Sequence, residues 1–148
     1  MTRLQLAIRL LHVLSAALWM GAALSWPGAL RRALALGPPH PEPALAQARG
    51  GLGLDLAAGL ATVVTGLVYV SPLGGGPLRL GILIGLTAAL ARLALLVTVA
   101  RPALRAVSDD VAAGELERAR GAARRLPAYV GTAHLLWLVA LGAMVFQP

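Results

Sequence analysis

Residues 80–100 read LGILIGLTAALARLALLVTVA, an apolar run in which Arg92 is the only charged side chain. A helix rises about 1.5 Å per residue, so this run is long enough to cross the ~30 Å hydrocarbon core of a bilayer. Three further stretches have the same largely apolar character, at residues 4–30, 52–70 and 127–146. The sequence therefore predicts one all-α domain over residues 1–148, an integral membrane protein with four spanning helices.

The composition agrees with this class and excludes others. Hydrophobic residues make up 58% of the chain and charged residues 13%, against about 25% charged residues in water-soluble proteins. Cysteine is absent, which excludes disulfides, thiolate metal sites and cysteine-bound iron–sulfur clusters. The net charge of +7 does not indicate binding to nucleic acid, because the arginines lie between apolar stretches. The first apolar run is longer than the apolar region of a signal peptide, so we expect it to stay as a span.

The connections between the predicted spans differ in kind. Residues 71–77, SPLGGGP, predict a tight turn, which makes the second and third spans an antiparallel hairpin and the whole an up-down four-helix bundle. Residues 31–50 contain GPPHPEP, which predicts an extended or turned segment. Residues 101–125 contain a serine cap and charge pairs at helical spacing. They predict a short cytoplasmic helix on the membrane surface.

Arginine is distributed unequally between the two sides of the predicted membrane. Three arginines lie on one side: Arg3, Arg9 and Arg79. Nine lie on the other: Arg31, Arg32, Arg49, Arg101, Arg105, Arg118, Arg120, Arg124 and Arg125. Cytoplasmic loops carry the excess of basic residues. The distribution therefore predicts a multi-pass protein of a bacterial-type plasma membrane, with both long connections in the cytoplasm and both termini outside.

Small and polar side chains repeat at helical spacing in the spans and mark faces that point into the bundle. One such stripe consists of Asp55, Gly59, Thr62, Gly66 and Tyr69. Close packing of helices is the simplest explanation of the glycines. Asp55 and Arg92 are charges within spans, where an unpaired charge costs several kcal/mol, so we expect them to form an ion pair. The pair either fixes the helix register, or Arg92 binds the carboxylate of a substrate or of a heme propionate.

Two histidines, His12 and His134, lie inside apolar helices, where an imidazole needs a partner. Each one either hydrogen-bonds to a neighbouring helix or ligates a metal or heme iron. From the helical rise and the spacing of neighbouring helices, we estimate that their Cα atoms lie roughly 12–18 Å apart. The two histidines could therefore share one iron only if the helices tilt or shift. His40 lies among prolines in a connection, where we expect it to be exposed.

The first span resembles a known family in the following pattern: Leu11-His12-Val13, then Trp19, Gly21 and Pro27 with a basic stretch after it. This pattern is similar to the opening helix of the HemJ-type protoporphyrinogen oxidases and of the related CopD copper-resistance membrane domain. HemJ-type proteins are small four-helix membrane proteins that bind heme b, and a histidine at this first-helix position is important in them. The resemblance thus implies a heme protein with His12 in the site.

The other spans resemble this family less. In Pro77-Leu78-Arg79-Leu80, Arg79 stands where the family has a lysine, and an arginine hardly deprotonates. The family's Asn-Glu-Pro stretch is not found in the fourth span, which has HLLW at residues 134–137 instead. The resemblance therefore supports the superfamily without establishing the oxidase activity.

Three functional hypotheses follow. The first is a heme b protein with a redox role in electron transfer or porphyrin oxidation, with His12 as an axial ligand and His134 as a second ligand. In this hypothesis Arg79 and Arg92 are the partners of the propionates. The second hypothesis is a non-catalytic subunit or assembly factor, whose glycine faces dock to other membrane subunits or to another copy of the chain.

Copper handling is the third hypothesis and ranks last. Copper sites are built from clustered cysteine, methionine and histidine side chains. The methionines within the spans, Met20 and Met144, are far apart in the sequence.

Overall fold

A computed structural model describes residues 2–72 and 79–146, and all regular elements in these ranges are helices. The order is α1 (Arg3–Ala22), α2 (Trp26–Leu36), α3 (Pro41–Val70), α4 (Leu80–Leu95), the π-helical η1 (Leu96–Ala100), α5 (Arg101–Ala112), α6 (Leu116–Ala123) and α7 (Leu126–Val145). The predicted all-α class is confirmed. Most of the turn predicted over residues 71–77 lies outside the described residues.

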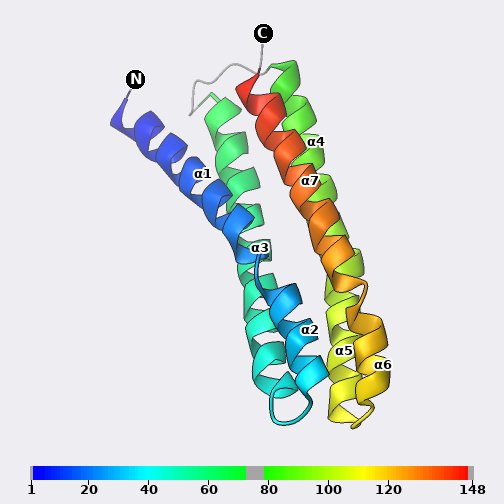
Figure 1. Cartoon of the computed structure of the whole chain (residues 1–148). Helices are drawn as coiled ribbons and strands as arrows, with labels where there is room; N and C mark the ends of the chain where they lie inside the picture. The colour runs from blue at the N-terminus through cyan, green and yellow to red at the C-terminus, as the bar shows by residue number, and fades with distance from the viewer. Residues whose placement is uncertain (1, 73–78, 147–148) are drawn as a thin grey trace.

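The helices join into four long rods that alternate in direction (Figure 1). The rods consist of α1 with α2, of α3, of α4 with η1 and α5, and of α6 with α7. Each is long and apolar enough to cross a membrane, as predicted. α1 begins and α7 ends at one end of the molecule, while α2, α5 and α6 lie at the other end. α1 packs mainly on α3, and α4 packs mainly on α7.

The first rod is not the continuous helix predicted over residues 4–30. α1 ends at Ala22, and α2 begins at Trp26 with Pro27 in its first turn. Proline has no N–H with which to continue the bonding of α1, but it is well tolerated where a helix begins. The chain therefore bends between α1 and α2, and the Trp26 ring packs closely against Gly51 of α3.

The prediction that GPPHPEP, residues 37–43, is extended or turned holds for its first four residues and is wrong for its last three, which belong to α3. Only residues 37–40 lie between α2 and α3. Gly37 ends α2 with a φ of +75°, which glycine adopts without strain. Pro41 then begins α3 at a position where a helix needs no N–H. Pro41 thus starts a helix rather than preventing one, while Pro38 and Pro39 lie in the turn before it.

The segment predicted as a short surface helix forms a helical hairpin instead. α5 continues α4 through η1, α6 leads into α7, and Gly114 turns the chain between α5 and α6 with a φ of +75°. Pro102 lacks an N–H, and the backbone widens to π-type bonding just before it, over Leu96–Ala100. The apolar faces of α5 and α6 pack on each other and on α2 and α3, so they are buried inside the molecule.

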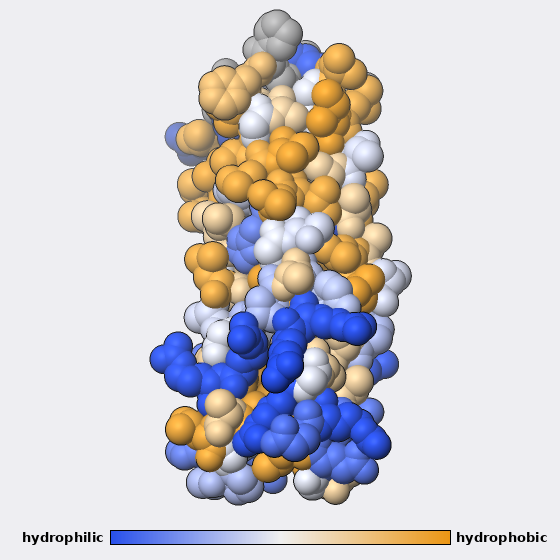
Figure 2. Space-filling model, turned by 45° about the vertical axis from the view of Figure 1, so that its right-hand side comes forward, coloured by the Kyte–Doolittle hydropathy of each residue, from blue (hydrophilic) through white to orange (hydrophobic). Residues whose placement is uncertain are grey.

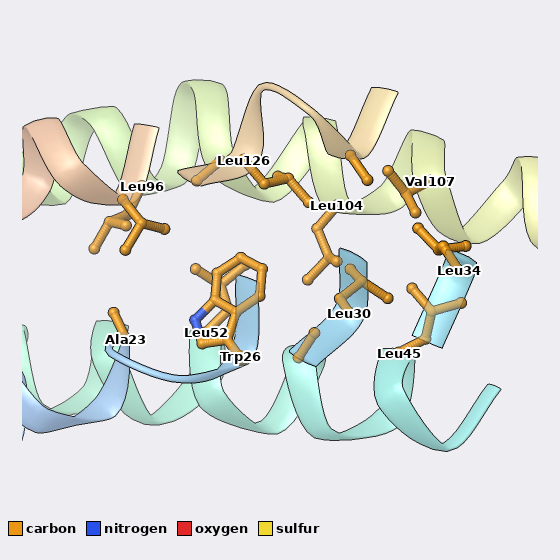
Figure 3. Packing of buried hydrophobic residues seen from close by; sticks show 14 of the residues in the cluster. Ala23, Trp26, Leu30, Leu34, Leu45, Leu52, Leu96, Leu104, Val107 and Leu126 are labelled. Carbon is orange, nitrogen blue, oxygen red and sulfur yellow. The ribbon is translucent and has the colours of Figure 1, made fainter. Parts of the chain in front are cut away.

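The main apolar core lies at the α2–α5–α6 end of the molecule (Figure 3). It includes Trp26, Leu30, Leu34, Leu45, Leu104 and Val107, which are all buried. At the other end most of the outward side chains are apolar. Leu4, Leu6 and Leu10 of α1, for example, are each more than half exposed. Figure 2 shows the same division on another face, where an apolar upper part meets a hydrophilic lower part.

Candidate functional site

A cavity of about 730 Å³ lies where the four rods meet near the start of α1 and the end of α7. α1, α3, α4 and α7 all contribute to its walls, which are mostly apolar. Val63, Leu86 and Trp137 are among the side chains of the inner part. The volume is in the range of about 300–1,000 Å³ that is typical of sites for small molecules and cofactors.

His12 is the histidine in the wall of this cavity. Its Nδ1 lies 3.0 Å from the carbonyl oxygen of Thr62 and 3.1 Å from Oγ1 of Thr65. A carbonyl only accepts, and the Thr65 hydroxyl donates to Ala61, so the proton of the neutral ring lies on Nδ1. Nε2 then carries the lone pair and has no hydrogen-bond partner among the described residues. This is the arrangement in which a protein presents an imidazole to a metal.

The neighbours of His12 hold its helix and its ring in place. Ser15 donates to the carbonyl of His12, and Thr62 lies 3.1 Å from the Ser15 hydroxyl, which connects α1 to α3. A Cβ at Gly66 would lie 3.1 Å from Cε1 of His12, so glycine leaves the room that the ring occupies. Thr62 and Gly66 belong to the stripe seen in the sequence, but Thr65 lies beside it, and its role could not be predicted.

The outer rim of the cavity is cationic. Arg9 and Arg79 line it from the starts of α1 and α4, and Tyr69 lines it from the end of α3. Both arginines are exposed and form no ion pair within the described ranges. The structure thus brings His12 and Arg79 to one cavity, as hypothesised, and adds Tyr69. A ligand with an apolar body and an anionic end matches this distribution of side chains.

Asp55 and Arg92 lie side by side in the interior. Nη2 of Arg92 donates to Oδ1 of Asp55 at 2.8 Å and to the carbonyl of Trp19 at 3.0 Å. The guanidinium also lies 4.4 Å from the centre of the Trp19 ring, a cation–π contact. Both charged side chains are fully buried. Arg92 does not line the cavity, but Trp19 does, so the indole contacts both the cavity and the ion pair.

His134 is not brought to the cavity. Its Nδ1 lies 2.8 Å from the carbonyl of Val130, one turn earlier in α7, and its Nε2 lies 3.3 Å from the carbonyl of Met20 in α1. Both ring nitrogens therefore lie near backbone oxygens, and because a neutral imidazole has one N–H, the ring donates to one of the two carbonyls. The neighbouring Trp137 donates to the carbonyl of Ala16 at 3.2 Å, so α7 contacts α1 through two aromatic rings.

In the described part of the chain, no three or more His, Cys, Asp or Glu side chains are grouped so that they could hold a metal ion. Comparisons with models of protein families, with characterised proteins and with solved structures give no match. The likeness of the first span to HemJ-type and CopD proteins therefore stays a prediction that rests on the residues quoted above.

Proposed function

We propose that the chain is an integral membrane protein, with α2, α5 and α6 in the cytoplasm and both termini outside. About 20 residues of each rod, at ~1.5 Å per residue, match a ~30 Å hydrocarbon core. The exposed leucines of α1 support this placement, because rows of such side chains need an apolar surrounding. The excess of arginine at the α5–α6 end supports the orientation.

We propose further that the cavity binds heme b and that the protein has a redox role. The observation that carries this proposal concerns His12, a residue of the cavity wall. Its Nδ1 is bound to the Thr62 carbonyl, and its Nε2 has no hydrogen-bond partner among the described residues. Neutral imidazole is a common axial ligand of heme iron. Heme in this place would supply one-electron chemistry, while the protein would supply the ligand, the apolar surrounding and the charges at the rim.

The rim would hold the anionic side of the heme. Propionates are carboxylates, and guanidinium groups bind carboxylates with two parallel hydrogen bonds. Arg9 and Arg79 lie at the outer rim, so propionates would reach cations without crossing the bilayer core. Tyr69 offers a hydroxyl at the same level. Because an arginine stays protonated at neutral pH, Arg79 is suited to hold charge rather than to exchange protons.

In this proposal His12 is the protein's ligand to the iron, and the other candidate residues support the frame. His134 lies between the Val130 carbonyl of its own helix and the Met20 carbonyl of α1. Arg92 is engaged by Asp55 and Trp19. The resemblance of the first span to a family of heme b proteins points to the same histidine. Electron transfer is the role that needs least beyond these residues.

The test is the absorption spectrum of the full chain, purified in detergent from heme-replete cells. We expect a Soret band that is lost in His12→Ala and partly restored by added imidazole, which can replace the missing ligand. His134→Ala should keep the band, because both nitrogens of that ring face backbone carbonyls.

His40→Ala is the matched control, since His40 is exposed between α2 and α3 and should not affect the spectrum. A colourless wild-type protein that takes up no heme on reconstitution would refute the proposal. Retention of the full Soret band in His12→Ala would refute the assigned ligand.

A further inference from the structure

A second, smaller cavity of about 280 Å³ lies between α5, α6 and the start of α7. Small residues of α5 and α6, namely Ala103, Ala106, Gly121 and Ala122, leave this space open. A Cβ added at Gly121 would meet no other atom within 4 Å. The polar part of the wall comes from Arg125 and Tyr129.

The position of this cavity along the rods determines its depth in the proposed membrane. Arg125 precedes α7, whose 20 residues would span about 30 Å at ~1.5 Å per residue. In the proposed membrane placement, Arg125 and Tyr129 therefore lie where the hydrocarbon core meets the cytoplasmic headgroups. Tyrosine is enriched at this level of membrane proteins.

At this end of the molecule some arginines have acidic partners, while others, including Arg125 of the cavity wall, have none among the described residues. Glu115 and Glu117 pair with Arg118 and Arg120 near the tip of the hairpin. Four arginines closer to the apolar part form no ion pair in the portion that the structure describes: Arg101, Arg105, Arg124 and Arg125. The hydrophilic band below the apolar surface is visible in Figure 2. This level of the molecule thus has an uncompensated positive charge.

We propose that this cavity binds the phosphate of an anionic phospholipid headgroup from the cytoplasmic leaflet. Arg125 pairs with the phosphate, the Tyr129 hydroxyl donates to it, and the space beside Gly121 accepts the headgroup. Basic pockets between helices at this depth are suited to anionic lipids, and arginine binds phosphate through charge-assisted hydrogen bonds. The proposal depends on the proposed membrane placement, but not on heme.

The experiment uses the full chain in nanodiscs that contain equal amounts of phosphatidylglycerol and phosphatidylcholine, with retained lipid counted by native mass spectrometry. We expect the wild type to retain phosphatidylglycerol selectively. Arg125→Gln should lower its retention about fivefold, the effect of one arginine at a membrane surface. Gly121→Leu should lower retention by filling the space, without a backbone clash.

Arg118→Gln is the matched control, because it removes the same charge from an exposed residue near the hairpin tip. It should leave retention unchanged. Equal loss in Arg118→Gln and Arg125→Gln, no loss in Arg125→Gln, or equal retention of both lipids would overturn the proposal. Displacement of the lipid by millimolar inorganic phosphate would also overturn it, in favour of a site for soluble phosphate.

A separate measurement tests the membrane placement: flotation of the wild-type chain with liposomes. A chain that does not float with liposomes contradicts the membrane placement itself. A chain that floats but does not discriminate between the two lipids contradicts only the headgroup site.

Discussion

At the scale of single residues, the ion pair of Asp55 and Arg92 shows how buried charge is stabilised here. Burial removes the water that would otherwise solvate each charged group, which costs free energy. If one partner of the pair is removed, the other charge stays buried and that desolvation cost is no longer offset. Arg92 has further contacts with the carbonyl and the ring of Trp19. Oδ2 of Asp55 and two nitrogens of Arg92 have no hydrogen-bond partner among the described residues, so the pair is not fully satisfied.

We therefore predict that Asp55→Ala and Arg92→Ala each lower the free energy of unfolding strongly, by about 3–5 kcal/mol. The double variant Asp55→Ala/Arg92→Ala should be less destabilised than the sum of the two single changes, because neither charge is left alone. Thermal or denaturant unfolding in detergent measures all three. Strictly additive effects would show that the two residues are not coupled.

Part of this site is predictable from single residues. The opposite charges of Asp55 and Arg92 and their depth in the spans are sufficient to predict the pair from the sequence. The spacing of polar residues points His12 into the bundle. The contacts of His134 are not predictable in this way, because its distance to the carbonyl of Met20 is set by how closely α7 approaches α1. That approach depends on side-chain packing between elements far apart in the sequence.

At the scale of elements, the contact of α1 with α3 depends on glycines, and Gly59 is the tightest case. A Cβ at Gly59 would lie 2.6 Å from the Trp19 ring and 2.8 Å from the Leu93 side chain, so either would have to move. Both neighbours are bulky, and Trp19 is 1% exposed with little room to shift. The glycine stripe of α3 thus acts here through close packing, which is also the simplest explanation of its spacing in the sequence.

We predict that Gly59→Ala destabilises the bundle by about 1–3 kcal/mol, the usual cost of overpacking. Gly53→Ala on the same helix is the control, because a Cβ there would meet nothing within 4 Å. It should stabilise the protein by about 0.5–1 kcal/mol, since alanine loses less backbone freedom in a helix. Melting temperatures in detergent distinguish the two, and a Gly59→Ala protein as stable as Gly53→Ala would contradict the packing argument.

The bounds of the elements are less predictable than their existence. Long apolar runs indicate four helices, and four are present that could span a membrane in the described ranges. The prolines are harder to interpret from sequence, because their effect depends on position. Pro41 begins α3 and Pro27 lies in the first turn of α2, while Pro102 is accommodated by the π-helical turn before it. The amphipathic pattern of α5 and α6 indicates that each helix has an apolar face that needs a partner. The sequence does not reveal that α2 and α3 are the partners, so a membrane surface is the partner that the pattern suggests.

At the scale of the whole molecule, the two ends have different constructions. The α2–α5–α6 end has a buried apolar core and a charged outer surface, as in a water-soluble bundle. The α1–α7 end has apolar outer side chains, and the large cavity lies inside it. A single surrounding medium would suit only one of these ends. The division therefore supports the proposed placement, in which one end lies in a bilayer and the other in water.

The orientation of this division is a final prediction. Nine arginines lie at the α5–α6 side and three at the opposite side. Because basic segments resist translocation, we predict that the hairpin lies in the cytoplasm. Two reporters are compared, one that is active only in the cytoplasm and one that is active only outside. Beside Gly114, in the turn between α5 and α6, we expect activity only from the cytoplasmic reporter. A reporter fused after residue 148 should be active only if it works outside. If the reporter at Gly114 works only outside and the reporter after residue 148 works only in the cytoplasm, the orientation is the reverse of the one predicted. Arg9 and Arg79 would then lie at the cytoplasmic side. The same pattern at both positions would contradict the up-down arrangement of α6 and α7 across the membrane.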